Sequence, residues 1–345
     1  MSLALLKAEK YLADPSNLMQ QFKANSFTAD LESLQVFDLD GAGTVKVQSN
    51  SYTGSAQNYN GYGSVSTAGR DVITANTGWI TYALNQKKYY PMPIDEIESE
   101  ESLNTFISRV NGLLYFKVSA DVDTYRLSKL SAQAGQVING QAGSTGNLST
   151  DINGLSTPAD LTTATILPTI ETAIAKMAEE EVGTGNYKLY LTPATARLLE
   201  QADKLTHFIN SREVDKAGAS VSISYIKTSY GSADIKVIPN KYFHSFTAGT
   251  NVPGANDNVI GTELDSTFRF LLLAKEAVNA VTKVQNARII PNGRLAGFDG
   301  NLFEMFLYYD IFIIERHQAV GTADGTTLLT PTSFNGVIKC KFEAA

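Results

Sequence analysis

The stretch Val122-Asp123-Thr124-Tyr125-Arg126-Leu127-Ser128-Lys129-Leu130 lies inside a long segment with helical periodicity. Apolar residues recur there at steps of three and four: Leu103, Ile107, Val110, Leu114, Val118, Val122 and Tyr125. The pattern predicts one helix over 98–134, roughly 50 Å long at ~1.5 Å per residue. Only Gly112 interrupts it, so a kink is expected there if anywhere.

The chain beyond this helix mixes helices and strands. Helices are predicted over 158–181 and 193–203, and strands over 187–191, 222–227, 235–238, 268–274 and 302–314. The last of these segments is rich in β-formers and is expected to be a long central strand. The two types of element follow no regular βαβ alternation, which favours the α+β class.

The chain before the helix predicts two extensions. Residues 1–40 carry short apolar patches but too few for a core, and are expected to form an arm that packs on something else. A strand at 44–47 leads into the Ser-, Gly-, Asn- and Tyr-rich stretch 48–78, and 79–90 is expected to be the returning strand. An isolated two-stranded hairpin is marginal in water, so this one must lie on a partner or on its own domain.

Composition excludes several classes of function. Charged residues make up 18% of the 345 residues against roughly 25% in an average soluble domain, which suits burial against other proteins. The net charge of −7 and the lack of a dense Lys/Arg cluster argue against tight binding to nucleic acid. The single Cys340 excludes an internal disulfide and is expected to be a small strand residue. No apolar run reaches the ~18 residues that cross a bilayer, and no signal peptide is recognisable, so we expect a soluble intracellular protein.

The order of these segments resembles that of one family. The stretch 122–130 is similar to the "V-D-A-Y-R-F-S-K-L" stretch common in major capsid proteins of tailed bacteriophages. Supporting segments are Thr44–Val47, Trp79–Tyr90, the acidic Ile94–Glu98, Tyr187–Pro193, Lys236–Pro239 and Phe270–Ala277. No single motif decides the matter; the resemblance rests on their agreement in order over almost the whole chain.

The resemblance implies an α+β fold of the Hong Kong-97 type. Residues 1–40 would be the N-terminal arm, 41–97 the extended E-loop hairpin, 98–134 the spine helix of the peripheral domain, 135–290 mainly the axial domain, and 291–345 a return to the peripheral domain. The implied function is a shell subunit with no catalytic residues, no cofactor and no metal. Interface roles are predicted for Phe22 and Phe27 in the arm, Tyr59, Tyr62 and Trp79 in the hairpin, and Asp123 and Arg126 on the spine helix.

The implied partners are copies of the chain in pentamers and hexamers, a separate scaffolding protein, a portal protein and double-stranded DNA bound non-specifically, with no membrane. The expected location is the virion capsid, assembled in the bacterial cytoplasm. Some family members cross-link a hairpin Lys to a neighbour's Asn. Lys46, Lys87 and Lys88 lie near the hairpin strands but not at its tip, so no cross-link is expected here.

Four other interpretations compete with this one. An encapsulin-like compartment shell shares the fold, and a carbohydrate-binding tail component would suit the Tyr/Asn/Gly-rich stretch but not the helices. Asp38-Leu39-Asp40-Gly41 resembles the first motif of haloacid-dehalogenase-type phosphatases, although Ala42 stands where that motif has Thr. Tyr125 and Lys129 have the Y-x-x-x-K spacing of short-chain dehydrogenases, but the Gly-rich nucleotide loop is missing.

Overall fold

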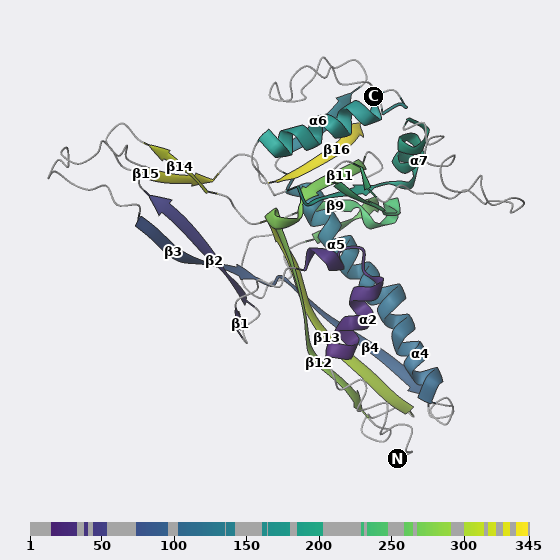
Figure 1. The fold of residues 1–345 in the computed structure, drawn as a ribbon. Helices are drawn as coiled ribbons and strands as arrows, with labels where there is room; N and C mark the ends of the chain where they lie inside the picture. The colour runs from purple at the N-terminus through teal and green to yellow at the C-terminus, as the bar shows by residue number, and fades with distance from the viewer. Residues whose placement is uncertain are drawn as a thin grey trace, which may run out of the picture.

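The computed structural model describes residues 15–32, 38–40, 44–53, 74–95, 103–134, 136–141, 161–163, 165–179, 185–202, 229–230, 233–247, 259–264, 268–290, 300–313, 317–321, 327–331 and 336–343. Figure 1 shows a body with two sheets stacked along one long helix, from which a hairpin leaves to the side.

The long helix is continuous but not uniform. It consists of α4 (Leu103–Leu113), a π-helical turn (Leu114–Val118) and α5 (Ser119–Ala132). The buried residues Val110, Leu114, Val118 and Val122 are spaced by four, and in a regular α-helix each such step drifts by about 40° away from the core. The wider π turn cancels part of that drift, and the Ser119 hydroxyl donates to the Leu114 carbonyl at 2.8 Å. The interruption expected at Gly112 is therefore a π turn just after it.

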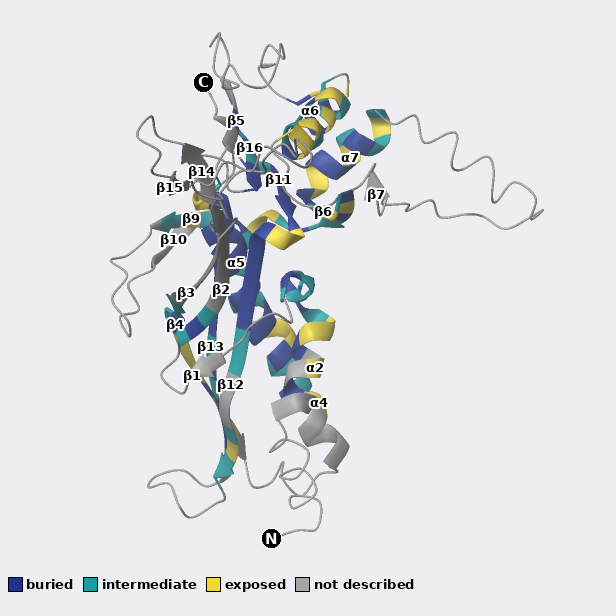
Figure 2. Ribbon diagram, turned by 60° about the vertical axis from the view of Figure 1, so that its left-hand side comes forward, coloured by how far each residue is buried: buried dark blue, intermediate teal, exposed yellow. Residues whose placement is uncertain are grey.

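A three-stranded antiparallel sheet packs against this helix. Its order is β12 (Val278–Ile290), β13 (Gly300–Ile313) and β4 (Gln86–Asp95), so the predicted long central strand is confirmed. The helix α2 (Pro15–Asn25) joins the same core, which contains Leu18, Phe22, Tyr90, Val110, Leu114, Val118, Val122, Tyr125, Phe303, Met305, Leu307 and Tyr309. Figure 2 shows buried residues along β13 and α5.

A mixed six-stranded sheet forms the other part of the body. Its order is β5 (Gln136–Gln141), β16 (Val337–Glu343), β11 (Phe268–Ala274), β6 (Tyr187–Leu191), β8 (Ala233–Val237) and β7 (Ser229–Tyr230). The helices α6 (Ile166–Glu179) and α7 (Pro193–Ala202) share one core cluster with it, while residues of α5 share another. Both faces of the six-stranded sheet are therefore covered, which explains why the segment Phe270–Ala274 of its strand β11 is apolar at every position. Cys340 is buried in β16, as expected.

The helix expected over 158–181 is shorter in the structure. It begins at Ile166, because the preceding residues form a turn in which the Thr165 hydroxyl accepts the Thr162 amide at 2.9 Å. Pro168 lies in the first helical turn, where backbone N–H groups have no acceptor within the helix. The missing N–H of proline therefore costs no helical hydrogen bond there. The strand expected over 222–227 lies outside the described residues.

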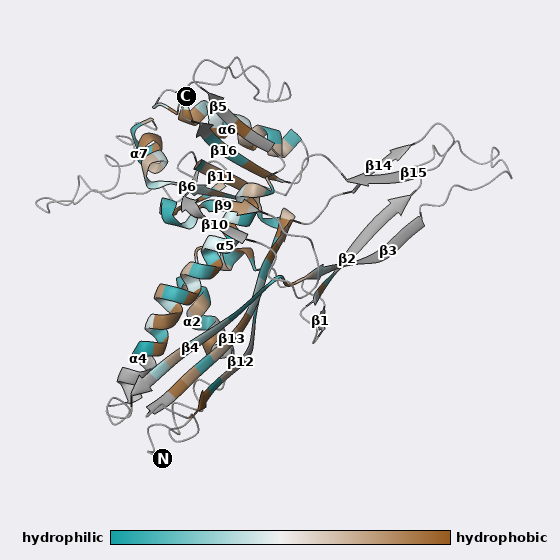
Figure 3. Cartoon of the chain, turned by 180° about the vertical axis from the view of Figure 1, so that it is seen from behind, coloured by the Kyte–Doolittle hydropathy of each residue, from teal (hydrophilic) through white to brown (hydrophobic). Residues whose placement is uncertain are grey.

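The hairpin consists of β2 (Thr44–Thr53) and β3 (Thr74–Ala83), with β1 (Asp38–Asp40) along the outer edge of β2. It leaves the body on the side opposite α7, as Figures 1 and 3 show from the two sides. The expected return over 79–90 is corrected in one respect. The hairpin ends at Ala83. Residues 86–95 instead form β4 of the three-stranded sheet β12-β13-β4, which we call the long sheet, because Tyr90 and Met92 face its core.

The remaining elements are short. Two further hairpins are formed by β9 (His244–Thr247) with β10 (Val259–Leu264) and by β14 (His317–Gly321) with β15 (Thr327–Pro331). Single 3-10 turns cover Ala29–Leu31, Asn240–Tyr242 and Lys275–Ala277. The turn Ala29–Leu31 carries the chain from α2 across α5, and Leu31 is buried in the core cluster that α5 shares with the six-stranded sheet.

The fold predicts a strong contrast between two identical substitutions. Phe270→Ala removes a fully buried ring from β11 and should lower the free energy of unfolding by about 3–5 kcal/mol. Phe116→Ala removes a ring that is 77% exposed and should change it by less than about 0.5 kcal/mol. Urea unfolding of the unassembled chain measures both, and similar losses in the two variants would contradict the assigned core.

Candidate functional site: the arm latch and the hairpin

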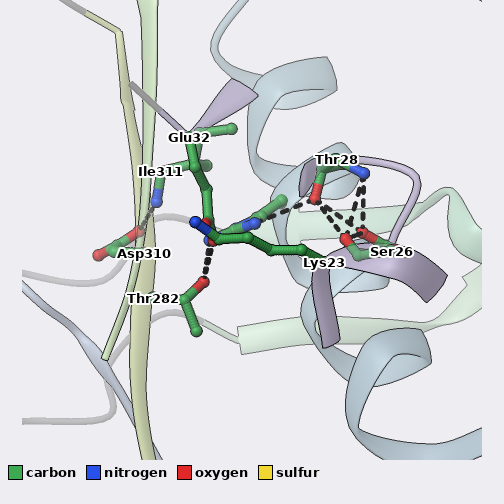
Figure 4. A network of polar contacts seen from close by, with 9 residues as sticks. Lys23, Ser26, Thr28, Glu32, Thr282, Asp310 and Ile311 are labelled. Atoms are coloured by element: carbon green, nitrogen blue, oxygen red, sulfur yellow. Dashed lines mark hydrogen bonds and ion pairs between the residues drawn. The ribbon is translucent and has the colours of Figure 1, made fainter. Parts of the chain in front are cut away.

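The Asp123 carboxylate holds the N-terminal segment onto the long helix. It is 1% exposed and accepts four hydrogen bonds from residues 26–28. The donors are the Ser26 hydroxyl at 2.6 Å, the Thr28 hydroxyl at 2.7 Å, the Phe27 amide at 2.8 Å and the Thr28 amide at 3.2 Å. A buried carboxylate needs such compensation for its lost hydration, so these contacts fix the path of the segment, of which Figure 4 labels Lys23, Ser26, Thr28 and Glu32.

One helical turn later, Arg126 ties the same segment to the long sheet. Its guanidinium is fully buried and donates to the Thr28 hydroxyl at 3.2 Å and to Glu32 at 3.0 Å. It also donates to the hydroxyl of Thr282 in β12, which in turn donates to Glu32. Lys23 pairs with the other oxygen of Glu32 at 3.1 Å. We call Ser26, Thr28, Glu32, Asp123, Arg126 and Thr282 the arm latch.

A second ion-pair group fastens the segment to the six-stranded sheet. Asp30 pairs with Lys236 at 2.9 Å and with Lys188 at 3.0 Å, and Lys236 also donates to the Phe27 carbonyl at 2.9 Å. Burial alone would raise the pKa of Asp30, but the hydrogen bonds and charges of the two lysines outweigh burial and lower the pKa below its ordinary value. The segment is thus bound to the helix and to both sheets.

The base of the hairpin is anchored by a small apolar cluster. Val45 of β2 and Leu84, just after β3, are buried against Val281 of β12 and Phe312 of β13. The Tyr82 ring packs on Phe312 with a centroid distance of 4.7 Å. The described side chains of the hairpin, those of residues 44–46 and 82–83, all lie at this base.

The structure places the predicted interface residues in different environments. Phe22, Asp123 and Arg126 are buried within their own subunit, where they contribute to the contacts between the arm and the long helix. Phe27 is half-buried, with its ring edge-to-face on Tyr242 at 5.4 Å. Trp79 lies in β3, but its side chain is outside the described part of the chain, as are Tyr59 and Tyr62. The interface roles of all seven predicted residues stay predictions.

Several residues of the site were not predicted. Glu32, Asp30 and Thr282 have no sequence signal that links them to the helix, because their partners are far away along the chain. The stretch Ser26-Phe27-Thr28 carries a local hint, since two hydroxyl residues after a helix often bind nearby polar groups. Nothing in the sequence indicates which carboxylate they bind.

The catalytic alternatives lack the geometry that they need. Asp38 and Asp40 lie in an antiparallel edge strand paired with β2, not at the carboxyl end of a parallel strand where such sites form. Tyr125 and Lys129 are both buried and both donate a hydrogen bond to the carboxylate of Asp310, rather than lining a nucleotide cleft. Within the described ranges no group of three His, Cys, Asp or Glu side chains could hold a metal ion. No helix among them is long and apolar enough to cross a membrane.

Comparison with known proteins identifies the fold of the chain. No protein-family model and no curated protein matches the sequence. Solved structures do match along its length. The capsid structure of the cyanophage P-SCSP1u superimposes with a TM-score of 0.56 at 11% identity, covering 93% of this chain and 89% of that one. The mature capsid of bacteriophage PhiM1 gives 0.51 at 13% identity, covering 92% and 87%. The chain has the fold of a phage capsid subunit.

A third structure, from Microbacterium phage Oxtober96, matches this capsid fold with a TM-score of 0.50 at 12% identity, covering 92% of this chain and 91% of that one. The predicted α+β capsid fold is confirmed. Because the match covers more than nine-tenths of the chain, the capsid fold accounts for the described structure as a whole rather than for one part. The division into named domains stays a prediction.

Removing the arm-latch carboxylate should destabilise the subunit. Asp123→Ala leaves two hydroxyls and two amides without their acceptor and should lower the free energy of unfolding by about 3 kcal/mol. Asp121→Ala, two residues earlier on the same helix, removes a partly exposed pair with Lys117 and a long hydrogen bond from the Tyr90 hydroxyl at 3.3 Å, and should cost at most about 1 kcal/mol. Chemical denaturation measures the free energy of unfolding of both variants. Equal decreases in the two variants would show that Asp123 has no special role.

The Asp30 ion pairs predict a pH dependence. Because the pKa of Asp30 is lowered on folding, its contribution is complete above its ordinary value of 3.8 and is lost as pH falls through the lower value in the folded chain. Asp30→Asn should therefore cost about 1 kcal/mol at pH 7, and the difference from wild type should shrink at acid pH. Unfolding curves from pH 7 to 3 measure this. A difference that is constant with pH would contradict the account.

Proposed function

We propose that the chain is the major capsid protein of a tailed bacteriophage, which self-assembles into an icosahedral shell around the phage DNA. The observation that carries the proposal is the match of 93% of this chain to 89% of a subunit in a cyanophage capsid structure. Among the described residues, buried polar side chains such as Asp123 and Arg126 hold segments of the chain together.

The hairpin supplies the physical reason for assembly. In the described structure β2 and β3 pair with each other and with the short β1, and Val45 at their base is buried on the body. A narrow sheet of this kind is barely stable alone in water. We infer that its far part is buried on a neighbouring copy, with Trp79, Tyr59 and Tyr62 as anchors, and that the exposed edge of Phe27 contributes from the arm.

Such a contact joins two different surfaces, one on each copy. Contacts of this heterologous type generate rings when the rotation between copies closes, and rings of five and six copies build closed shells. The proposal includes pentamers and hexamers, a separate scaffolding protein, a portal protein and DNA packaged without sequence preference. The mild net negative charge of −7 suits a lining that does not bind DNA tightly. The proposed location is the virion capsid, after assembly in the host cytoplasm.

Electron microscopy tests the proposal. The chain is expressed with and without its genomic neighbours and imaged in negative stain, and closed polyhedral or tubular particles are expected. DNA in the particles identifies a phage capsid, whereas protein cargo would identify an encapsulin-like compartment. Only small species in both preparations would contradict the shell function.

A deletion tests the role of the hairpin. Removing Gln48–Gly78 and joining the ends with a short turn should leave a folded subunit with native circular dichroism that forms no closed shells. Trp79→Ala is the milder companion and should lower the yield of shells without changing the melting temperature of the free subunit by more than a few degrees. Closed shells from the deletion variant would rule out the proposed role of the hairpin.

A further inference from the structure

The hairpin joins the body through a very short connection. Only Leu84 and Asn85 separate β3 of the hairpin from β4 of the long sheet. Leu84 is 1% exposed and packs with Val281 and Phe312, so the connection is held from its apolar side. The direction in which the hairpin leaves the body is therefore set by whatever fixes the backbone at these two residues.

The group that fixes this backbone is the carboxylate of Asp310. Asp310 lies in β13 and has no exposed surface. Its Oδ2 accepts the Asn85 amide at 3.1 Å. Its Oδ1 accepts the Lys129 ammonium at 2.5 Å, the Tyr125 hydroxyl at 3.1 Å and the Ile311 amide at 2.7 Å. One side chain thus joins the hairpin connection, the long helix and the central strand.

The surroundings make this carboxylate hard to replace. The Lys129 ammonium lies 5.1 Å from the centre of the Phe312 ring and 5.8 Å from that of Tyr125, both of which favour a cation. All four partners of Asp310 donate hydrogen bonds, so the site requires a group that only accepts. Asparagine has nearly the same shape, but its NH₂ would face one of these donors and the charge of Lys129 would lose its counter-ion.

We propose that Asp310 is a positioning residue that fixes the direction of the hairpin relative to the long helix through Asn85 and Lys129. Lys129 lies one turn after Arg126 on α5, so the same helix face that holds the arm also holds the hairpin. Both extensions are thereby oriented by one rigid element. The consequence for assembly rests on the proposed function, since a hairpin held at a fixed angle meets its neighbour at a fixed angle.

Hydrogen exchange on the unassembled full-length chain tests the proposal without requiring shells. In Asp310→Asn the amides of residues 82–86 should lose protection by about tenfold or more relative to wild type. Protection in β6 and β11 should stay within about threefold. Lys129→Met, which keeps the length of the side chain and removes its charge, should loosen the same residues less, because Asp310 keeps its other three donors.

Asp234→Asn is the matched control, since it removes an exposed carboxylate from its pair with Lys188 far from the hairpin. It should leave residues 82–86 unchanged. Unchanged protection at residues 82–86 in both Asp310→Asn and Lys129→Met would overturn the proposal. So would an equal loss throughout the chain, because a purely structural residue gives that result. The two proposals can fail separately. If the wild type forms no shells but residues 82–86 lose protection selectively in Asp310→Asn, the shell function is wrong and the positioning role of Asp310 stands.

Discussion

The buried face of α5 is the constraint on which the rest of the structure depends. Within two turns it buries Asp123, Arg126 and Lys129, three charged side chains with almost no exposure. Each is compensated by groups from other parts of the chain: residues 26–32 of the arm, Thr282 of β12, and Asp310 of β13. Since an uncompensated buried charge costs several kcal/mol, these segments cannot separate from the helix independently. Arm, hairpin connection and long sheet are therefore oriented by one helix.

This arrangement gives the body and the hairpin different sources of support. The body has continuous apolar cores on both sheets, and the base of the hairpin is anchored to it by Val45 and by Leu84, just after β3. The chain thus divides its roles between a body that folds on its own contacts and a hairpin that is held at its base. A rigid base suits a contact between copies, because the direction of the hairpin is fixed before the partner arrives.

The sequence predicts the elements that local patterns determine, but not the contacts between residues that lie far apart along the chain. The long helix follows from the spacing of Val110, Leu114, Val118 and Val122, and the central strand from the β-forming run that ends at Ile313. The π turn is a consequence of the same spacing, but periodicity alone does not distinguish it from a kink. The resemblance singles out Asp123 and Arg126, and their roles between subunits stay predictions. Their partners within the chain, Thr28, Glu32 and Thr282, lie between 94 and 156 residues away, and local patterns carry no information about such pairings.

The most direct test of the account is a reconstruction by cryo-electron microscopy of particles formed by the wild-type chain. The account predicts that β2 and β3 of each copy lie across a neighbouring copy with the Trp79 ring in that contact, while residues 26–32 stay on α5 of their own chain. A hairpin folded back on its own subunit, or an arm exchanged between neighbours so that Asp123 binds another copy's Ser26 and Thr28, would contradict it.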